Sequence, residues 1–253
     1  MIQRSALLLA LLLPFHASAA TDSAARDLAD LMIAAHGGIE KWNSASTLSF
    51  RHLSGNREPA SEMLAVVEQG SRRTYMEWPA KKSMIVGDGS TVWSVNNDEK
   101  TPARFMVNLH YYFLGLPFFT RDPGVRLEMA GEGTLPGEKV VARKLRMTYD
   151  PGVGESSDVY VMYIDPSTNL LRGIEYSVTH PAVVPAGKAS LEPYFRIYES
   201  YENVDGIQIA TTMRSVDPSG ETRSTSLFDQ LSMKLPFDES KMRMPENGVV
   251  AKR

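Results

Sequence analysis

The chain has 253 residues, of which 43% are hydrophobic and 23% are charged, so it is too apolar to be disordered and long enough for one large or two small domains. It contains no cysteine, which excludes disulfides, a thiol nucleophile and a lipid-bearing N-terminal cysteine. The formal net charge is −3 without any lysine or arginine block, which argues against nucleic acid as a partner.

Residues 1–19 have the form of a secretory signal peptide. Arg4 provides the basic start, an apolar run extends from Ala6 to Leu13, and the A-S-A sequence at 17–19 fits the cleavage rule. The run is shorter than the ~20 residues of a membrane span and Pro14 interrupts it, so cleavage is favoured over anchoring. We therefore predict a periplasmic, non-lipidated protein without a transmembrane segment. Its mature net charge is −4, from 26 basic and 30 acidic residues.

An amphipathic helix is predicted at the start of the mature chain. Asp22 or Thr21 can cap its N-terminus, and Gly37-Gly38 can end it. A shorter turn from Ile39 to Trp42 continues the helix and is expected to place Trp42 on the core. The apolar residues at spacings of three and four are Ala25, Leu28, Leu31, Met32 and Ala35.

From Thr47 onward the hydrophobic period changes from 3.6 to 2. Short strand-like runs follow one another and are separated by Gly, Asp, Asn and Pro residues, among them the hairpin turn GDGS at 87–90. Two runs show the alternation most clearly, with apolar positions Val141, Leu145, Met147 and Tyr149 in one and Ile174, Tyr176 and Val178 in the other.

About ten or eleven such strands after one helix predict an α+β fold with a single domain over residues 20–253. The short turns favour an antiparallel meander. A meander of this length tends to curl, which gives a curved sheet or incomplete β-barrel whose concave face must be filled or left hollow.

The segment FMVNLHYYFLGLPFF, Phe105 to Phe119, is the natural filler for that face. As a helix from about Arg104 to Leu116 it is apolar all round except at Asn108 and His110, and Pro117 is expected to break its end. About 15 residues at ~1.5 Å each are too short to span a bilayer. The helix is either part of the core or a lid over a hydrophobic cavity with residues 114–117 as its hinge.

Motifs for catalysis and for cofactor binding are missing from the sequence. It has no G-x-S-x-G elbow and no phosphate-binding glycine loop, and His36, His52, His110 and His180 lack the spacing of metal ligands. We therefore predict no catalytic residue, no metal site, no cofactor and no enzymatic activity. A hydrolase would require a serine within hydrogen-bond reach of His110 and a carboxylate that orients this histidine.

Three longer patterns carry a resemblance to a known family: VGDGSTVWSV at 86–95, VYVMYIDPSTNLLRGIEYS at 159–177 and YENVDGIQIATTMRSVDPSG at 201–220. Together they resemble the lipoprotein localisation factors of the bacterial envelope (the LolA and LolB type) and, more closely, their uncharacterised exported relatives. The resemblance implies an incomplete antiparallel barrel, closed by helices over a hydrophobic cavity that holds acyl chains.

The leading hypothesis is therefore a periplasmic carrier or binding protein for a lipid or for an acylated protein or peptide. The alternative is an envelope interaction or sensor module that binds a protein partner through an edge strand or exposed aromatic residues, with the 105–119 segment on the surface. The residues predicted to line the cavity are Phe105, Leu109, Tyr112, Phe113 and Leu116 from the helix, and Trp93, Leu145 and Tyr176 from strands.

Overall fold

The computed structural model describes residues 22–55, 59–98, 102–153, 158–180, 183–191 and 193–252. The predicted signal peptide, residues 1–19, lies outside the described residues. Within them, the helices are α1 (Ser23–Ala35), α2 (Ile39–Ser44) and α3 (Ala103–Phe119), with 3-10 turns at Pro59–Ser61, Pro79–Lys81 and Glu239–Met242.

Thirteen strands in the described chain form one sheet in which every neighbouring pair is antiparallel. The strands are β1 (Thr47–Ser54), β2 (Met63–Glu68), β3 (Thr74–Trp78), β4 (Ser83–Gly87), β5 (Val92–Val95), β6 (Val125–Gly133), β7 (Ala142–Tyr149), β8 (Val159–Ile164), β9 (Leu171–Ser177), β10 (Tyr194–Val204), β11 (Ile207–Val216), β12 (Thr222–Ser232) and β13 (Val249–Val250).

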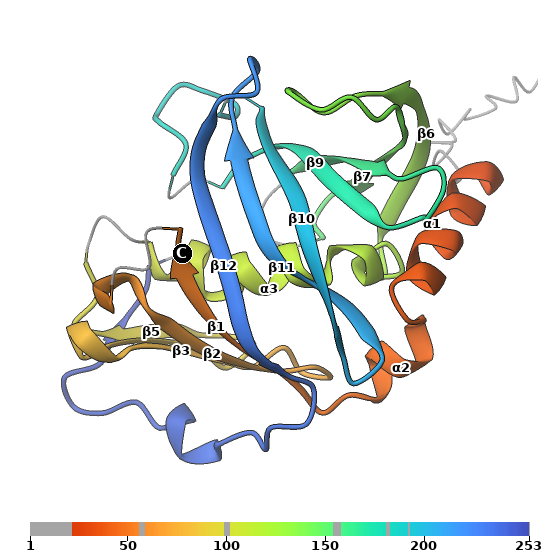
Figure 1. Cartoon of the computed structure of the whole chain (residues 1–253). Helices are drawn as coiled ribbons and strands as arrows, with labels where there is room; N and C mark the ends of the chain where they lie inside the picture. Colours follow the sequence, from red (N-terminus) through yellow and green to blue (C-terminus); the bar gives the residue numbers. More distant parts are fainter. Residues whose placement is uncertain are drawn as a thin grey trace, which may run out of the picture.

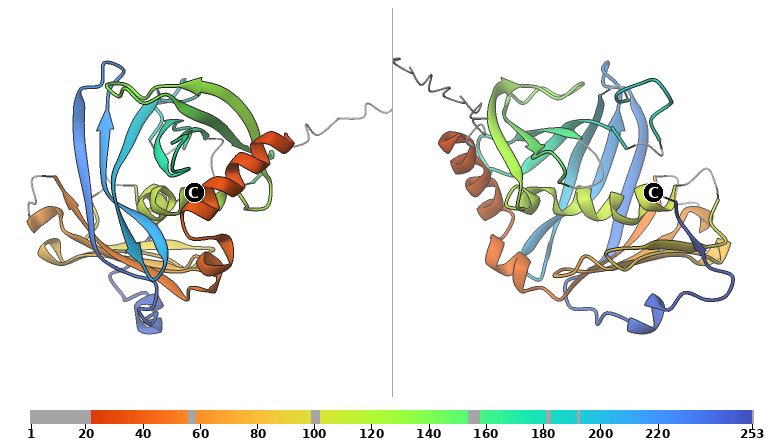
Figure 2. Two further views of the ribbon diagram at one scale, coloured as in Figure 1. Left: turned by 45° about the vertical axis from the view of Figure 1, so that its right-hand side comes forward. Right: turned by 180° about the vertical axis from the view of Figure 1, so that it is seen from behind.

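The order of the strands explains where α3 lies. The chain enters the sheet at β1, extends it through β5, and then passes along α3 to β6 at the opposite edge; β6 to β12 return until β12 pairs with β1. Because α3 connects distant parts of a curved sheet, it crosses the concave face between β1–β5 and β7–β12 (Figures 1 and 2). The apolar segment is thus buried against both parts of the sheet.

This open antiparallel sheet with its helices confirms the predicted α+β class and the incomplete barrel. It has more strands than the ten or eleven expected. One of them, β13 with two residues, is too short for an alternating pattern to reveal it. The hairpin at 87–90 is confirmed: Asp88 accepts hydrogen bonds from the backbone N–H groups of Ser90 (2.8 Å) and Thr91 (2.7 Å).

The first helix forms as predicted, except that Leu31 faces solvent and not the core. Asp22 caps α1 by accepting a hydrogen bond from the N–H of Ala24 at 3.0 Å. Leu31, expected in the core, is 47% exposed, because the buried stripe is displaced toward the neighbouring positions. The buried residues of α1 are Ala25, Leu28, Ala29, Met32 and Ile33.

His36, directly after α1, ties this helix to two strands. Its Nδ1 donates to the carbonyl of Gln208 at 3.0 Å on β11, and its Nε2 accepts from the N–H of Leu171 at 3.1 Å on β9. Burial lowers the pKa of His36 to about 4. The imidazole is therefore neutral, in the form that can donate from one nitrogen and accept at the other.

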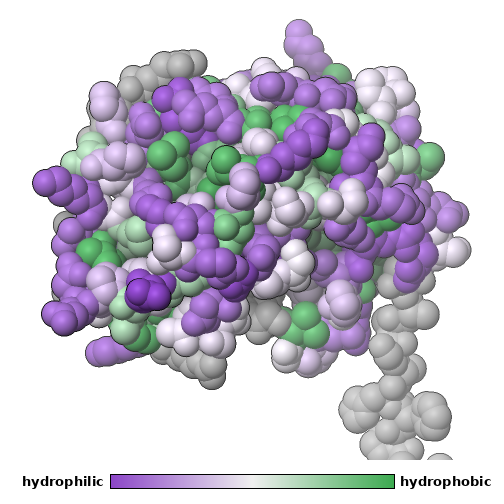
Figure 3. All heavy atoms as spheres, turned by 90° about the horizontal axis from the view of Figure 1, so that it is seen from below, coloured by the Kyte–Doolittle hydropathy of each residue, from purple (hydrophilic) through white to green (hydrophobic). Residues whose placement is uncertain are grey.

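The last residues, 233–252, form a C-terminal strap over the convex face of β2–β5. Phe237 of the strap packs against Tyr75 at 5.4 Å between ring centroids, and Val66, Val86 and Trp93 complete this separate apolar cluster. The strap ends with β13 paired to β5. The face of the molecule on this side is largely hydrophilic, with hydrophobic residues in small separate groups (Figure 3).

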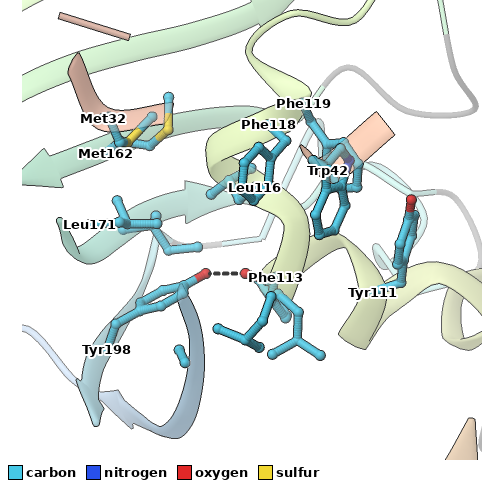
Figure 4. Packing of buried hydrophobic residues seen from close by; sticks show 14 of the residues in the cluster. Met32, Trp42, Tyr111, Phe113, Leu116, Phe118, Phe119, Met162, Leu171 and Tyr198 are labelled. Carbon is cyan, nitrogen blue, oxygen red and sulfur yellow. Dashed lines mark hydrogen bonds between the residues drawn. The ribbon is translucent and has the colours of Figure 1, made fainter. Parts of the chain in front are cut away.

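The C-terminal half of α3 is the centre of the main core. Trp42, confirmed as a core residue, stacks on Phe118 with ring centroids 4.3 Å apart and an angle of 7° between the planes (Figure 4). Gly115 permits this close approach. A Cβ at that position would lie 2.9 Å from Cζ2 of Trp42 and 2.6 Å from Cζ of Phe119.

Pro117 does not end α3, contrary to the prediction; the helix continues to Phe119. A proline leaves the carbonyl four residues earlier without its helical donor, which here is the carbonyl of Phe113. The hydroxyl of Tyr198 on β10 donates to that carbonyl at 2.8 Å (Figure 4). Residues 114–117, the hinge of the lid hypothesis, are therefore buried and helical, which favours a core helix for this half of α3.

Candidate functional site

A cavity of about 780 Å³ lies along the N-terminal half of α3. The helix contributes one side of it, because residues spaced by three, four and seven positions share a face. The opposite wall comes from β7–β10 and from the segment that follows β9. The α3 residues that line it include Arg104, Phe105, Asn108, Leu109 and Tyr112.

A row of tyrosines crosses the wall of the cavity opposite α3. Tyr160 on β8 pairs with Tyr176 on β9, and Tyr176 pairs with Tyr194 on β10, so the three side chains share one face of the sheet. The Tyr160 and Tyr176 rings stack with centroids 6.1 Å apart. Tyr149 at the end of β7 also lines the cavity, and its buried hydroxyl has no hydrogen-bond partner within the described residues.

These tyrosines are hydrogen-bond donors at neutral pH. Burial raises the pKa of Tyr149, Tyr160 and Tyr176 above the ordinary value. For Tyr160, the nearby carboxylate of Asp158 raises the pKa further. The cavity therefore has a wall of aromatic faces whose polar ends are protonated hydroxyls.

The cavity wall also contains charged side chains, namely Arg72, Arg104, Asp122, Asp158 and Arg196. Arg72 makes a bidentate ion pair with Asp122, at 2.7 and 2.6 Å, and its guanidinium lies over the ring of Phe119. Arg196 on β10 lies over the ring of Phe113, with its guanidinium carbon 4.1 Å from the ring centroid. Asp158 accepts hydrogen bonds from the backbone N–H and the hydroxyl of Thr179, at 2.6 and 2.8 Å.

The structure brings together five of the eight residues predicted to line a cavity. They are Phe105, Leu109, Tyr112, Phe113 and Tyr176.

The other three predicted residues lie elsewhere. Leu116 and Leu145 are fully buried in the main core. Leu116 continues the cavity face of α3 but lies one turn beyond the cavity, and Leu145 lies deeper along β7 than Tyr149. Trp93 points to the convex face, where it lines a second cavity of about 360 Å³ beside the strap. Val141, assigned to the apolar face of its strand, precedes β7 and is 53% exposed.

Sequence reasoning missed Arg72, Arg196 and most of the tyrosine row. The alternation in β7 does place Tyr149 on the inner face, and the same holds for Tyr176 in β9. Tyr194 and Arg196 are not identifiable in this way, because they follow a long loop and their position beside Tyr176 depends on the pairing of β9 with β10.

His110 does not form the arrangement that a hydrolase would require. Its ring stacks on His52 with centroids 4.2 Å apart, and its Nδ1 has no hydrogen-bond partner within the described residues. Burial lowers the pKa of both histidines, for His52 to about 4, and the charge of Arg196 lowers both pKa values further.

In the part of the chain described here, no three His, Asp or Glu side chains are grouped to bind a metal ion. The helices of that part are also too short or too polar to cross a membrane.

The open antiparallel sheet with a helix across its concave face agrees with the incomplete barrel that the sequence resemblance implied. A DUF1329 family protein from Desulfovibrio piger has the same fold: its structure superposes with a TM-score of 0.53 at 14% identity, over 87% of this chain and 97% of that one. At this identity the likeness concerns the fold alone.

Two further solved structures are similar over most of their length. One is a putative outer membrane lipoprotein-sorting protein domain from Vibrio parahaemolyticus, with a TM-score of 0.49 and 10% identity over 86% of this chain and 95% of that one. The other is a LolA superfamily protein from Nitrosomonas europaea, with a TM-score of 0.46 and 13% identity over 88% and 98%. No protein-family model and no curated protein matches the sequence.

Proposed function

We propose that this protein is exported to the periplasm and there binds or carries a lipid or an acylated protein or peptide, without catalysing a reaction. The observation that carries the proposal is the cavity of about 780 Å³ along α3. Its volume falls within the ~300–1,000 Å³ of typical small-molecule sites, and Phe105, Leu109 and Tyr112 give it an apolar side. An acyl chain would lie along this face of the helix.

The expected affinity follows from the burial of methylene groups. Each methylene removed from water contributes ~0.8 kcal/mol, so eight to ten of them contribute roughly 6–8 kcal/mol. That corresponds to a dissociation constant near the micromolar range, without any charged contact. Such binding suits a protein that must also release its ligand.

The direct test is native mass spectrometry, with organic extraction, of the protein purified without detergent from the periplasm of its own host. Copurification of a species of lipid mass is the expected result. A ligand-free mass that persists after incubation with phospholipid and acylated peptide would overturn the proposal.

A substitution in the cavity should separate ligand binding from folding. Leu109→Asp introduces a charge on the cavity face of α3, where an acyl chain would have to desolvate it. We expect at least about a tenfold loss of affinity for a fluorescent fatty acid, with the cooperative unfolding transition retained.

Two matched variants control this experiment. Val141→Asp places the same charge at a surface position and should leave binding unchanged, whereas Leu116→Asp places it in the core and should unfold the protein. Unchanged binding by Leu109→Asp would contradict a ligand site along α3.

The alternative function, binding of a protein partner in the envelope, is supported by one observation. β6 (Val125–Gly133) ends the sheet, and within the described residues no strand pairs with its outer edge, where the carbonyl of Leu127 accepts from the N–H of Asp22 at 3.3 Å. An extended peptide can add to such an edge. The apolar segment itself does not provide the surface patch that this alternative predicted, since most of α3 is buried. A ligand-free mass together with a captured peptide that protects the amides of β6 from hydrogen exchange would favour it.

A further inference from the structure

Arg196, in the cavity wall, has a guanidinium group that is only partly hydrogen-bonded. Nε and Nη1 of its guanidinium are buried and have no hydrogen-bond partner within the described residues. The face of the guanidinium is covered by the ring of Phe113. A buried cation is costly unless an anion or several acceptors compensate it. Among the described residues, no carboxylate forms an ion pair with this arginine.

The other charges of the cavity do not provide that counter-charge. Asp122 is held by both bonds from Arg72, and Asp158 is held by Thr179 on the neighbouring segment. The charge of Arg196 also helps to lower the pKa of His52 and of His110, so these rings are neutral and add no counter-charge. Arg196 itself lines the cavity.

Tyrosine hydroxyls lie on the same inner face as Arg196. Tyr194 is two residues before Arg196 on β10, so both side chains point to the same face, and Tyr176 lies beside them on β9. The Arg196 guanidinium opposes the rise that burial causes in the pKa of Tyr176, which places the two groups close together. A cation with neighbouring hydroxyl donors is suited to bind the oxygens of a carboxylate or phosphate.

We infer that the ligand of the cavity is a single amphiphile with an anionic head group, whose carboxylate or phosphate meets Arg196 while its acyl chain lies along α3. This inference rests on the proposed function and adds the chemistry of the head group to it. The volume of about 780 Å³ suits one small amphiphile rather than a bulky lipid with several chains.

The test uses four probes with the same ten-carbon chain: decanoate, decyl phosphate, decanol and decyltrimethylammonium. Titration calorimetry of the full mature chain compares their dissociation constants below micelle-forming concentrations. The two anions should bind at least about tenfold more tightly than decanol, and the cation should bind most weakly. The stronger of the two anions then identifies carboxylate or phosphate as the natural head group.

Variants assign the effect to Arg196. Arg196→Gln should weaken both anions by about tenfold or more and leave decanol unchanged, because only the charge contact is lost. Arg196→Lys should retain the preference for anions but bind them less tightly, since a lysine cannot present the same planar fork. Arg223→Gln is the matched control; this arginine is exposed on β12, outside the cavity lining, so its loss should leave the preference unchanged.

The outcomes separate this inference from the proposed function. If none of the probes binds, the proposed function fails. If all bind alike, or if Arg196→Gln weakens decanol as much as decanoate, the cavity binds chains but Arg196 is not a head-group site. The comparison of probes on the unaltered protein remains decisive even if Arg196→Gln does not fold.

Discussion

At the scale of single residues, the most informative pair is Pro117 and Tyr198. A proline inside a helix normally costs about 3 kcal/mol, partly through the carbonyl that loses its donor. Here the carbonyl of Phe113 accepts the hydroxyl of Tyr198 from β10, so the defect in the helix becomes a bond between α3 and the sheet. This bond holds α3 at the junction of its cavity half and its core half.

Removal of that hydroxyl should be costly only while the proline is present. Tyr198→Phe leaves a buried carbonyl unsatisfied and should lower the free energy of unfolding by about 1–3 kcal/mol, measured by urea denaturation. In a Pro117→Ala background the new N–H can bond to Phe113, so Tyr198→Phe should cost less than half as much. Equal costs in the two backgrounds would show that the hydroxyl has no such role.

At the scale of elements, the C-terminal strap and the sheet depend on each other. Phe237 covers Tyr75, and the guanidinium of Arg73 lies 4.9 Å from the centroid of the Phe237 ring. Arg73 also bonds to Glu68 of β2 and to Glu239 of the strap. The strap thus shields the convex face of β2–β5, which would otherwise expose Trp93 and its neighbours.

Truncation of the strap's aromatic anchor should measure this dependence. Phe237→Ala removes a half-buried ring and should lower the free energy of unfolding by about 2 kcal/mol in urea denaturation. Leu235→Ala, two residues earlier and 44% exposed, is the control and should cost less than about 0.5 kcal/mol. A similar cost for both would mean that the strap contributes no specific packing.

At the scale of the whole molecule, the buried His36 and His110 and the half-buried His52 should make stability depend on pH. Burial lowers the pKa of His36 and of His52 to about 4, and that of His110 in the same direction. In the unfolded chain each has a pKa of about 6.5. The unfolded state therefore binds more protons than the folded state below pH 6.5, and stability falls as the pH drops toward 4.

Between pH 7 and 5, above most carboxylate titration, His36 and His52 should each cost about 2 kcal/mol of stability, and His110 should act in the same direction. Urea denaturation at pH 7, 6 and 5 measures the total. His36→Gln should lower stability at pH 7 through its lost bonds, but it should reduce the pH dependence by about a third. An unchanged pH dependence would mean that His36 is not neutral in the folded protein.

Much of the architecture could be inferred from local patterns. The leading helix, its Asp22 cap, the turn at 87–90 and the alternation in β7 and β9 involve residues within a few positions of one another. Capping hydrogen bonds, hydrophobic periodicity and turn conformations depend on residues that are close in sequence, so they can be predicted from the sequence. Together with the resemblance, they were enough for an incomplete antiparallel barrel.

The lining of the cavity was harder to predict from local sequence patterns. The α3 face with Phe105 and Leu109 follows from helical spacing, but the wall opposite requires the register of four strands. Trp93 is an example of a residue whose position could not be predicted. Its strand was recognisable, but the side of the sheet that its side chain faces depends on the pairing of β5 with β4 and on the strap. A shift of one residue would reverse every such assignment.

The sequence alone thus determines the helices and strands, their order along the chain and the apolar character of residues 105–119, since these depend on residues that are near neighbours in sequence. The tertiary structure decided that α3 crosses the concave face, that Tyr198 satisfies the carbonyl freed by Pro117, and that Arg196 lies in a cavity beside Tyr176. These relations join residues that are far apart in the sequence. They exist only once the strands pair in one register, because that pairing sets which side chains share a face.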